Sequence, residues 1–205
     1  MKKLITVRYF LGLLLGICFI SCGNDKVLIQ GETEWQLEQN ALFKDASRSP
    51  LMDKDRKKFK SLDFFKYNEN FVVTAHLERT PGTPYMKMKT TTDDFNEERI
   101  YGVLSFKIED NVFQLNAYQS KEAMNTPGYE NYLFLPFLDQ TNGDQSYGGG
   151  RYIDLRIPDG DSIVIDFNKS YNPYCVYNER YSCPLVPREN FVNYKIEAGM
   201  KNFNN

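Results

Sequence analysis

Residues Arg151–Asn168 read R-Y-I-D-L-R-I-P-D-G-D-S-I-V-I-D-F-N, which is two alternating apolar runs around a Pro-Asp-Gly turn. Alternation of apolar and polar side chains is the pattern of a half-buried β-strand. The turn, residues 158–160, fits a three-residue hairpin loop with its glycine in the left-handed conformation. This loop length places Leu155 opposite Ile163 and keeps the apolar side chains on one face. The pattern therefore predicts an antiparallel hairpin in that register.

The polar face of the predicted hairpin carries Tyr152 opposite Asp166, with Asn168 two residues further along. This face is either a solvated outer surface or the wall of a cleft in which Asp166 and Asn168 face a common ligand. Successive side chains of a strand point to opposite faces, so Arg151 should end the apolar face, away from Asp166. The sequence leaves both interpretations of the polar face open.

The alternating pattern recurs along most of the chain. Short strands separated by turn signals are typical of an antiparallel β-sandwich or barrel, here with about 7–9 strands. Aromatic residues make up 15% of the chain, which also favours pleated, half-buried surfaces. The fold class is therefore predicted as mainly β, α+β only at the amino terminus. The predicted strands are Phe71–Leu77, Tyr85–Thr90, Arg99–Lys107, Val112–Gln119, Tyr132–Leu138, Arg151–Ile157 and Ser162–Asn168.

Two short helices are predicted between residues 33 and 61, before the first strand. Thr33 and Gln36 have the spacing of a capping box at a helix start. Ser49 followed by Pro50 fits a second start, with Ser49 as the cap and Pro50 in the first helical position.

Residues 1–22 have the features of a bacterial export signal. Lys2, Lys3 and Arg8 accompany an apolar run, Tyr9–Ile20, that is short for a membrane-spanning helix and typical of a signal-peptide core. Ile20-Ser21-Cys22 resembles the lipoprotein processing box, which implies cleavage before Cys22 and its acylation. An ordinary secreted protein and an uncleaved anchor are the alternatives.

This organisation predicts a signal peptide over residues 1–21, a lipidated tether over 22–31 and one β-rich domain over 32–205. The protein would then lie in the cell envelope, anchored to the outer membrane or to a leaflet that faces the periplasm. The formal net charge of the whole chain is -2, and loss of the basic leader makes the mature protein more acidic. Nucleic acid is therefore not expected as a partner.

Two cysteines, Cys175 and Cys183, remain once Cys18 leaves with the leader and Cys22 is acylated. In an oxidising compartment, such an isolated pair most simply forms a disulfide. A zinc site would need further ligands, and His76 is the sole histidine of the chain. We therefore expect neither a metal nor another cofactor.

Polar residues around the hairpin are the candidates for a ligand site, and the glycines at 148–150 should permit a turn or a close approach of the backbone to a ligand. Three functions stay open. The first is an exported hydrolase-like enzyme with Asp166 as acid or base and Arg151 as an anion clamp. The second is a domain that binds a small polar ligand, and the third is a structural cluster that satisfies backbone groups of the carboxyl-terminal loop. The candidate residues are Asp139, Tyr147, Arg151, Tyr152, Asp166, Asn168, Tyr171 and Asn172.

Three segments of the last third resemble the family called domain of unknown function 1684. They are F-L-D-Q-T-N-G-D-Q-S-Y-G-G-G-R-Y-I-D-L, D-F-N-K-S-Y-N-P-Y-C-V-Y-N and C-P-L-V-P-R-E-N. The resemblance runs from about Trp35 to Lys201 and implies no particular activity. It differs at Gln145 and Ser146, where the family usually has an acidic residue and threonine. Relatives without export signals keep both cysteines, which implies a packing or ligand role for Cys175 and Cys183.

Overall fold

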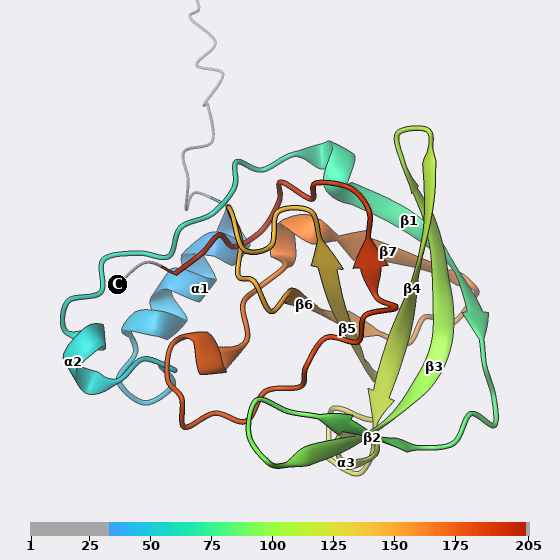
Figure 1. Cartoon of the computed structure of the whole chain (residues 1–205), viewed down its shortest axis with the longest axis horizontal. Coiled ribbons are helices and arrows are strands. Elements are labelled where there is room, and N and C mark those ends of the chain that lie inside the picture. Colours follow the sequence, from blue (N-terminus) through green and yellow to red (C-terminus); the bar gives the residue numbers. More distant parts are fainter. Residues whose placement is uncertain (1–32, 204–205) are drawn as a thin grey trace, which may run out of the picture.

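The computed structural model describes residues 33–203, in which eight strands form one curled, half-barrel sheet (Figure 1). The strand order is β6-β5-β4-β3-β1-β7, with β2 added to β3, and these pairs are antiparallel. The short β8 pairs with β5 in parallel. The mainly β prediction is confirmed. The strands are β1 (Val72–Arg79), β2 (Met86–Lys89), β3 (Phe95–Ile108), β4 (Asn111–Ser120), β5 (Tyr132–Asp139), β6 (Arg151–Arg156), β7 (Ser162–Asp166) and β8 (Phe191–Val192).

The pairing of β6 and β7 differs from the predicted hairpin. Leu155 lies opposite Leu133 of β5, and Ile163 lies opposite Ala75 of β1. The two strands are thus the outer strands of the sheet, and residues 158–160 connect one edge to the other. The predicted register was wrong because alternation determines which face of a strand is buried, but does not determine its neighbour.

The main core lies on one face of the sheet and has the alternation that the sequence predicts. On β1, Val73, Ala75 and Leu77 are buried, whereas His76 between them is exposed. The apolar residues of β6 and β7 join the same core although these strands do not pair. Further members are Leu104, Leu115, Leu133, Leu135, Phe137, Ile153, Ile165 and Phe167.

The opposite face of the sheet is also covered over β4, β5 and β6. Tyr118, Phe134 and Tyr152 form a second apolar cluster there, and Tyr171 packs against it from the carboxyl-terminal segment. The rings of Phe134 and Tyr152 meet edge to face, with 4.7 Å between their centroids. Strand β5 is therefore buried on both sides, and Tyr152 does not lie on a wet outer surface.

The first helix, α1 (Glu34–Lys44), begins at the predicted capping box. The Gln36 backbone N–H donates to Thr33 Oγ1 at 3.2 Å, and the Thr33 N–H donates to Gln36 Oε1 at 3.3 Å. Its Phe43 ring packs against Tyr177 at 4.7 Å, so the helix is fixed to the carboxyl-terminal segment.

The second helix, α2 (Asp53–Arg56), begins after Met52 and not after Ser49 as predicted. The Ser49 hydroxyl does bind backbone: it donates to the Phe43 carbonyl at 2.7 Å and accepts from the Leu51 N–H at 3.2 Å. Ser49 therefore stabilises the turn after α1 and does not cap α2.

Short helical segments complete the fold. They are α3 (Lys121–Met124), which follows β4, and the 3-10 turns η1 (Glu69–Phe71), η2 (Phe167–Lys169) and η3 (Tyr174–Val176). Within residues 33–203, none of the helices has the length and apolar character needed to cross a membrane. The predicted signal peptide and the whole predicted tether, Cys22 included, lie outside the described residues.

The glycine run before β6 approaches the backbone of β5 closely. Gly150 has φ 89°, and a Cβ there would lie 2.7 Å from the Phe137 carbonyl oxygen. A side chain at this position would therefore collide with β5 and adopt a strained backbone conformation.

Candidate functional site

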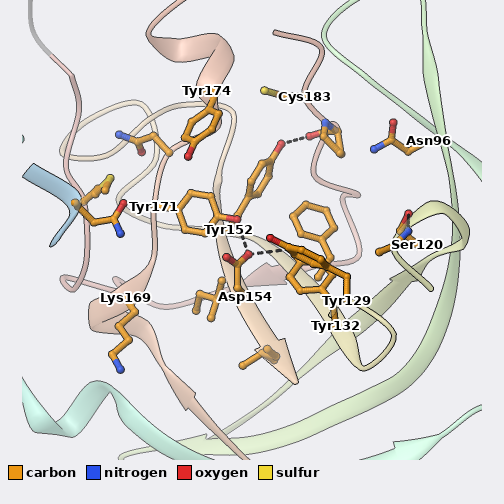
Figure 2. Close-up of a pocket in the computed structure, with 18 of the residues that line it drawn as sticks. Asn96, Ser120, Tyr129, Tyr132, Tyr152, Asp154, Lys169, Tyr171, Tyr174 and Cys183 are labelled. Atoms are coloured by element: carbon orange, nitrogen blue, oxygen red, sulfur yellow. Dashed lines mark hydrogen bonds between the residues drawn. The ribbon is translucent and has the colours of Figure 1, made fainter. Parts of the chain in front are cut away.

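A cavity of ≈ 990 Å³ lies over the second face of the sheet (Figure 2). Its floor includes Phe134 of β5 and Asp154 of β6, while α1 contributes Trp35. The carboxyl-terminal segment adds Tyr171 and Cys183. The cavity therefore forms where helix α1 and the carboxyl-terminal segment meet the face of the sheet that the main core does not use.

The carboxylate of Asp154 lines the cavity and binds two of its tyrosines. Its Oδ1 accepts hydrogen bonds from the hydroxyls of Tyr132, at 2.8 Å, and Tyr171, at 2.5 Å (Figure 2). Burial is the main cause that raises the pKa of both phenols; the charge of Asp154 comes next for Tyr132, and the interaction with Tyr132 and then Asp154 for Tyr171, so both phenols stay protonated and donate. Both bonds go to Oδ1 and the residue is exposed, so Oδ2 can still accept from a ligand.

A second carboxyl group, that of Glu98, lines the cavity from β3. The residue is only 2% exposed, and its Oε2 has no hydrogen-bond partner among the described residues. Burial raises the pKa of Glu98 to about 7, since an ionised carboxylate is poorly stabilised away from water. A ligand that offers a donor or a positive charge would remove this penalty.

The carboxyl-terminal wall is held to the sheet by β6. The Tyr152 hydroxyl donates to the Pro184 carbonyl, and Tyr152 and Tyr171 exchange two backbone hydrogen bonds of 2.9 and 3.0 Å. In this wall Cys183 accepts a hydrogen bond from the Cys175 backbone N–H at 3.2 Å. Both cysteines are free thiols in the structure, so the disulfide stays a prediction.

Arg151 and Asp139 lie on the other side of the sheet, outside the cavity. Both side chains are fully buried, and Arg151 Nη2 lies 2.8 Å from Asp139 Oδ2. The guanidinium also donates to the carbonyls of Ile196, at 2.8 Å, Met200, at 3.2 Å, and Ala198. Arg151 therefore holds the segment 196–200 against β6 through hydrogen bonds, and it is not placed to bind a ligand anion.

Asp166 and Asn168 bind each other rather than facing a common ligand. Asp166 Oδ1 accepts from the Asn168 backbone N–H at 3.1 Å and from its side-chain Nδ2 at 3.0 Å. Asn168 also exchanges two hydrogen bonds of 2.9 Å with the backbone of Asn68. Asp166 lines the rim of the cavity, but this pair stabilises the end of β7.

Four of the predicted residues line the cavity: Tyr152, Asp166, Tyr171 and Asn172. Within this group, Asn172 donates to the Lys201 carbonyl at 2.8 Å, so its amide group also stabilises the chain end. Of the remaining four, Arg151, Asp139 and Asn168 do not line the cavity. Tyr147 lies against Gly149 and outside the cavity lining. Within the described residues, no cluster of three or more histidine, cysteine or acidic side chains suits a metal.

Asp154, Tyr132 and Glu98 line the cavity but were not among the predicted site residues. Asp154 shares a face of β6 with the predicted Tyr152, and that alternation was available from the sequence. The contribution of Tyr132 depends on the pairing of β5 with β6, and that of Glu98 on the path from β3 through β4. Those pairings were not predicted.

Comparison with known proteins adds a family and a similar structure. The solution NMR structure of an uncharacterized protein of Haloarcula marismortui has a TM-score of 0.63 and 32% sequence identity. That similarity covers 81% of this chain and 89% of the Haloarcula marismortui chain. No curated protein matches. The model of the family described as "Protein of unknown function (DUF1684)" matches residues 57–201, and the chain therefore belongs to that family.

Proposed function

We propose that this protein is a lipid-anchored protein of the cell envelope that binds a small polar ligand in the cavity around Asp154. The observation that carries the proposal is the convergence of the Tyr132 and Tyr171 hydroxyls on one carboxylate inside a cavity of ≈ 990 Å³. Cavities of about 300–1,000 Å³ with a few convergent polar groups among apolar walls are typical of small-molecule sites.

The chemistry of the walls supports binding over nucleophilic catalysis. Burial raises the pKa of Cys183 to about 12, so its thiol is protonated at neutral pH and is a poor nucleophile. The histidine, His76, is exposed on β1 and does not line the cavity. Asp166, the acid of the enzymatic alternative, already accepts two hydrogen bonds from Asn168. The Asp154 carboxylate, which two tyrosine hydroxyls orient, supports the binding of a ligand.

The anchor is proposed from the amino-terminal sequence. A basic start, an apolar run of about a dozen residues and a small residue before Cys22 support cleavage and acylation. Replacing Cys22→Ala should abolish incorporation of a radiolabelled fatty acid, and Cys18→Ala, four residues earlier, is the matched control. Equal labelling of both variants would contradict the anchor.

Ligand binding is tested on the full-length protein in detergent micelles. Thermal shifts against sugars, amines, organic acids and nucleotides identify a ligand class, and titration calorimetry then measures its affinity. Asp154→Asn should weaken binding about tenfold, because it removes the charge that two tyrosines orient. Asp110→Asn, in the turn between β3 and β4, should leave affinity unchanged. A ligand that binds Asp154→Asn as tightly as the unaltered protein would refute the proposed site.

A further inference from the structure

The walls of the cavity combine negative charge with aromatic rings. Its charged lining residues are Glu98, Glu122, Asp154 and Asp166 against one cation, Lys169. Lys169 Nζ already lies 3.9 Å from Asp166 Oδ2, so these two charges offset each other. The lining residues therefore carry a net negative charge, while Arg156 lies outside the lining and over the rings of Tyr129 and Tyr132, at 5.3 and 5.6 Å from their centroids. Rings of Trp35, Tyr129, Tyr132, Tyr152, Tyr171 and Tyr174 line the same space.

A cavity with such walls favours a positively charged ligand. The faces of tyrosine and tryptophan rings attract cations, and excess carboxylate repels organic anions. An uncharged sugar could stack on the rings, but it would leave the charge of the cavity uncompensated. An organic cation satisfies both features of the wall.

The unpartnered carboxyl of Glu98 indicates which kind of cation fits. Its Oε2 is buried and has no hydrogen-bond donor among residues 33–203. A quaternary ammonium group has no N–H to donate, whereas a primary ammonium group has three. A primary amine can therefore supply both the missing hydrogen bond and the compensating charge.

Asp154 provides a second carboxyl at a separate position. Glu98 lies on β3 and Asp154 on β6, with β4 and β5 between them. Neighbouring strands are about 4.8 Å apart, so the two backbones are separated by about 14 Å across the sheet. Tyr132 of β5 lies between these strands and is affected electrostatically by both carboxyl groups. One ammonium group cannot neutralise both carboxyl groups, whereas a chain with an amine at each end can do so.

We propose that the cavity binds a linear aliphatic diamine or polyamine, with one ammonium group at Glu98, another at Asp154, and the intervening methylenes against Tyr132. This inference rests on the proposed function, because it assigns a ligand class to the same cavity. The aromatic rings pack against the methylene chain, and the two carboxyl groups determine the positions of its ends.

Titration calorimetry with defined probes tests the ligand class on the full-length protein in micelles. The probes are putrescine, cadaverine and spermidine, with butylamine as a one-ended control and butanediol as an uncharged two-ended control. The best two-ended amine should bind at least about tenfold more tightly than butylamine, because it gains a second charged hydrogen bond. Butanediol should show no measurable binding.

Two variants separate the ends of the ligand. Glu98→Gln and Asp154→Asn should each reduce the affinity for the two-ended amine to about that for butylamine, a loss of about tenfold. Asp110→Asn removes an exposed carboxylate in the turn between β3 and β4; it is the matched control and should bind normally. If Glu98→Gln fails to fold, Asp154→Asn and the probe series still decide the matter.

The pH dependence of binding distinguishes an ammonium at Glu98 from one elsewhere. The titratable groups on which Glu98 acts electrostatically include Tyr118 of β4, which also interacts with Glu189, and Tyr132 of β5, and Glu122 lines the same cavity. None of these supplies positive charge. Since the pKa of Glu98 is about 7, its ionised fraction rises about tenfold between pH 6 and pH 8. Affinity for the two-ended amine should rise accordingly in the unaltered protein and stay flat in Glu98→Gln.

The outcomes separate this inference from the proposed function. If butanediol or a sugar binds at the cavity and the amines do not, the inference is overturned and the cavity remains a ligand site. If no compound from any class binds, both are overturned. Amine binding that neither variant weakens would place the amine elsewhere and overturn the inference.

Discussion

Arg151 and Asp154 lie three residues apart on β6, yet their side chains enter opposite faces of the sheet and different kinds of polar cluster. Arg151 is surrounded by the carboxylate of Asp139 and by backbone carbonyls of the chain end, and it is fully buried. Asp154 receives two tyrosine hydroxyls on one oxygen and opens to a cavity. The polar contacts of Arg151 stabilise the fold, whereas Asp154 keeps a carboxylate oxygen that can bind a ligand.

The largest expected effect is on stability, and it comes from the buried cluster of Arg151 and Asp139. Arg151→Ala should lower the free energy of unfolding by about 3–5 kcal/mol, because it leaves the buried carboxylate of Asp139 without its partner. Urea unfolding followed by circular dichroism measures this change. Arg48→Ala, which removes an exposed ion pair with Asp45, should cost less than about 1 kcal/mol. A stable Arg151→Ala protein that no longer binds ligand would reverse the roles of the two clusters.

The next effect concerns Glu98 and the pH dependence of stability. The pKa of this group rises from 4.5 to about 7 on folding, so the folded protein holds a proton that the unfolded chain releases. Stability from this group is therefore present below pH 4.5 and is lost as pH rises towards 7, by about 3 kcal/mol. The difference in unfolding free energy between the unaltered protein and Glu98→Gln should show this slope. No change in that difference between pH 4.5 and 7.5 would refute the assignment.

A smaller effect is expected from the cysteine pair in the cavity wall. If the exported protein forms the predicted disulfide, Cys175→Ser should lower its unfolding free energy by about 2 kcal/mol, because a short closed loop restricts the unfolded chain. The same substitution measured under reductant should have a much smaller effect. Labelling of two reactive thiols in the folded, exported protein would show that the pair is reduced.

The smallest expected effect comes from removing a single hydrogen bond to Asp154. Tyr171→Phe keeps the ring but removes one donor to Asp154, so ligand affinity should fall about fivefold, equivalent to about 1 kcal/mol. Tyr194→Phe, whose ring packs against the main core on the other face, is the control and should not change affinity. Equal affinity of Tyr171→Phe and the unaltered protein would mean that the hydroxyl does not orient Asp154 for binding.

Local pattern was sufficient to predict the approximate positions of β1 to β7, the buried faces of β1, β6 and β7, and the capping box of α1, but it missed β8 and the 3-10 turn η2 that follows β7. The burial of Val73, Ala75 and Leu77 on β1 follows from alternation alone. Ser49 shows the limit of local pattern, since its hydroxyl binds the preceding Phe43 carbonyl instead of starting a helix. Short polar side chains can stabilise several kinds of turn, and the tertiary contacts decide among them.

Most of the candidate site depended on contacts between distant parts of the chain. Arg151 was expected at the end of the apolar face, but its partners Ile196 and Met200 come from the chain end. Asp154 needed Tyr132 from the neighbouring strand and Tyr171 from the segment that follows β7. The alternation of apolar residues identifies the buried face of a strand. The partners that come from distant parts of the chain can be identified only once the order of the strands is known.

The pairing of Tyr171 with β6 has a consequence for solubility. An uncovered outer strand offers free N–H and C=O groups to other chains and promotes aggregation. Tyr171 covers that edge at Tyr152 through two backbone hydrogen bonds, while its side chain reaches Asp154. The residue that helps to form the cavity therefore also shields the sheet, so a ligand that holds Tyr171 in place would at the same time protect the protein from self-association.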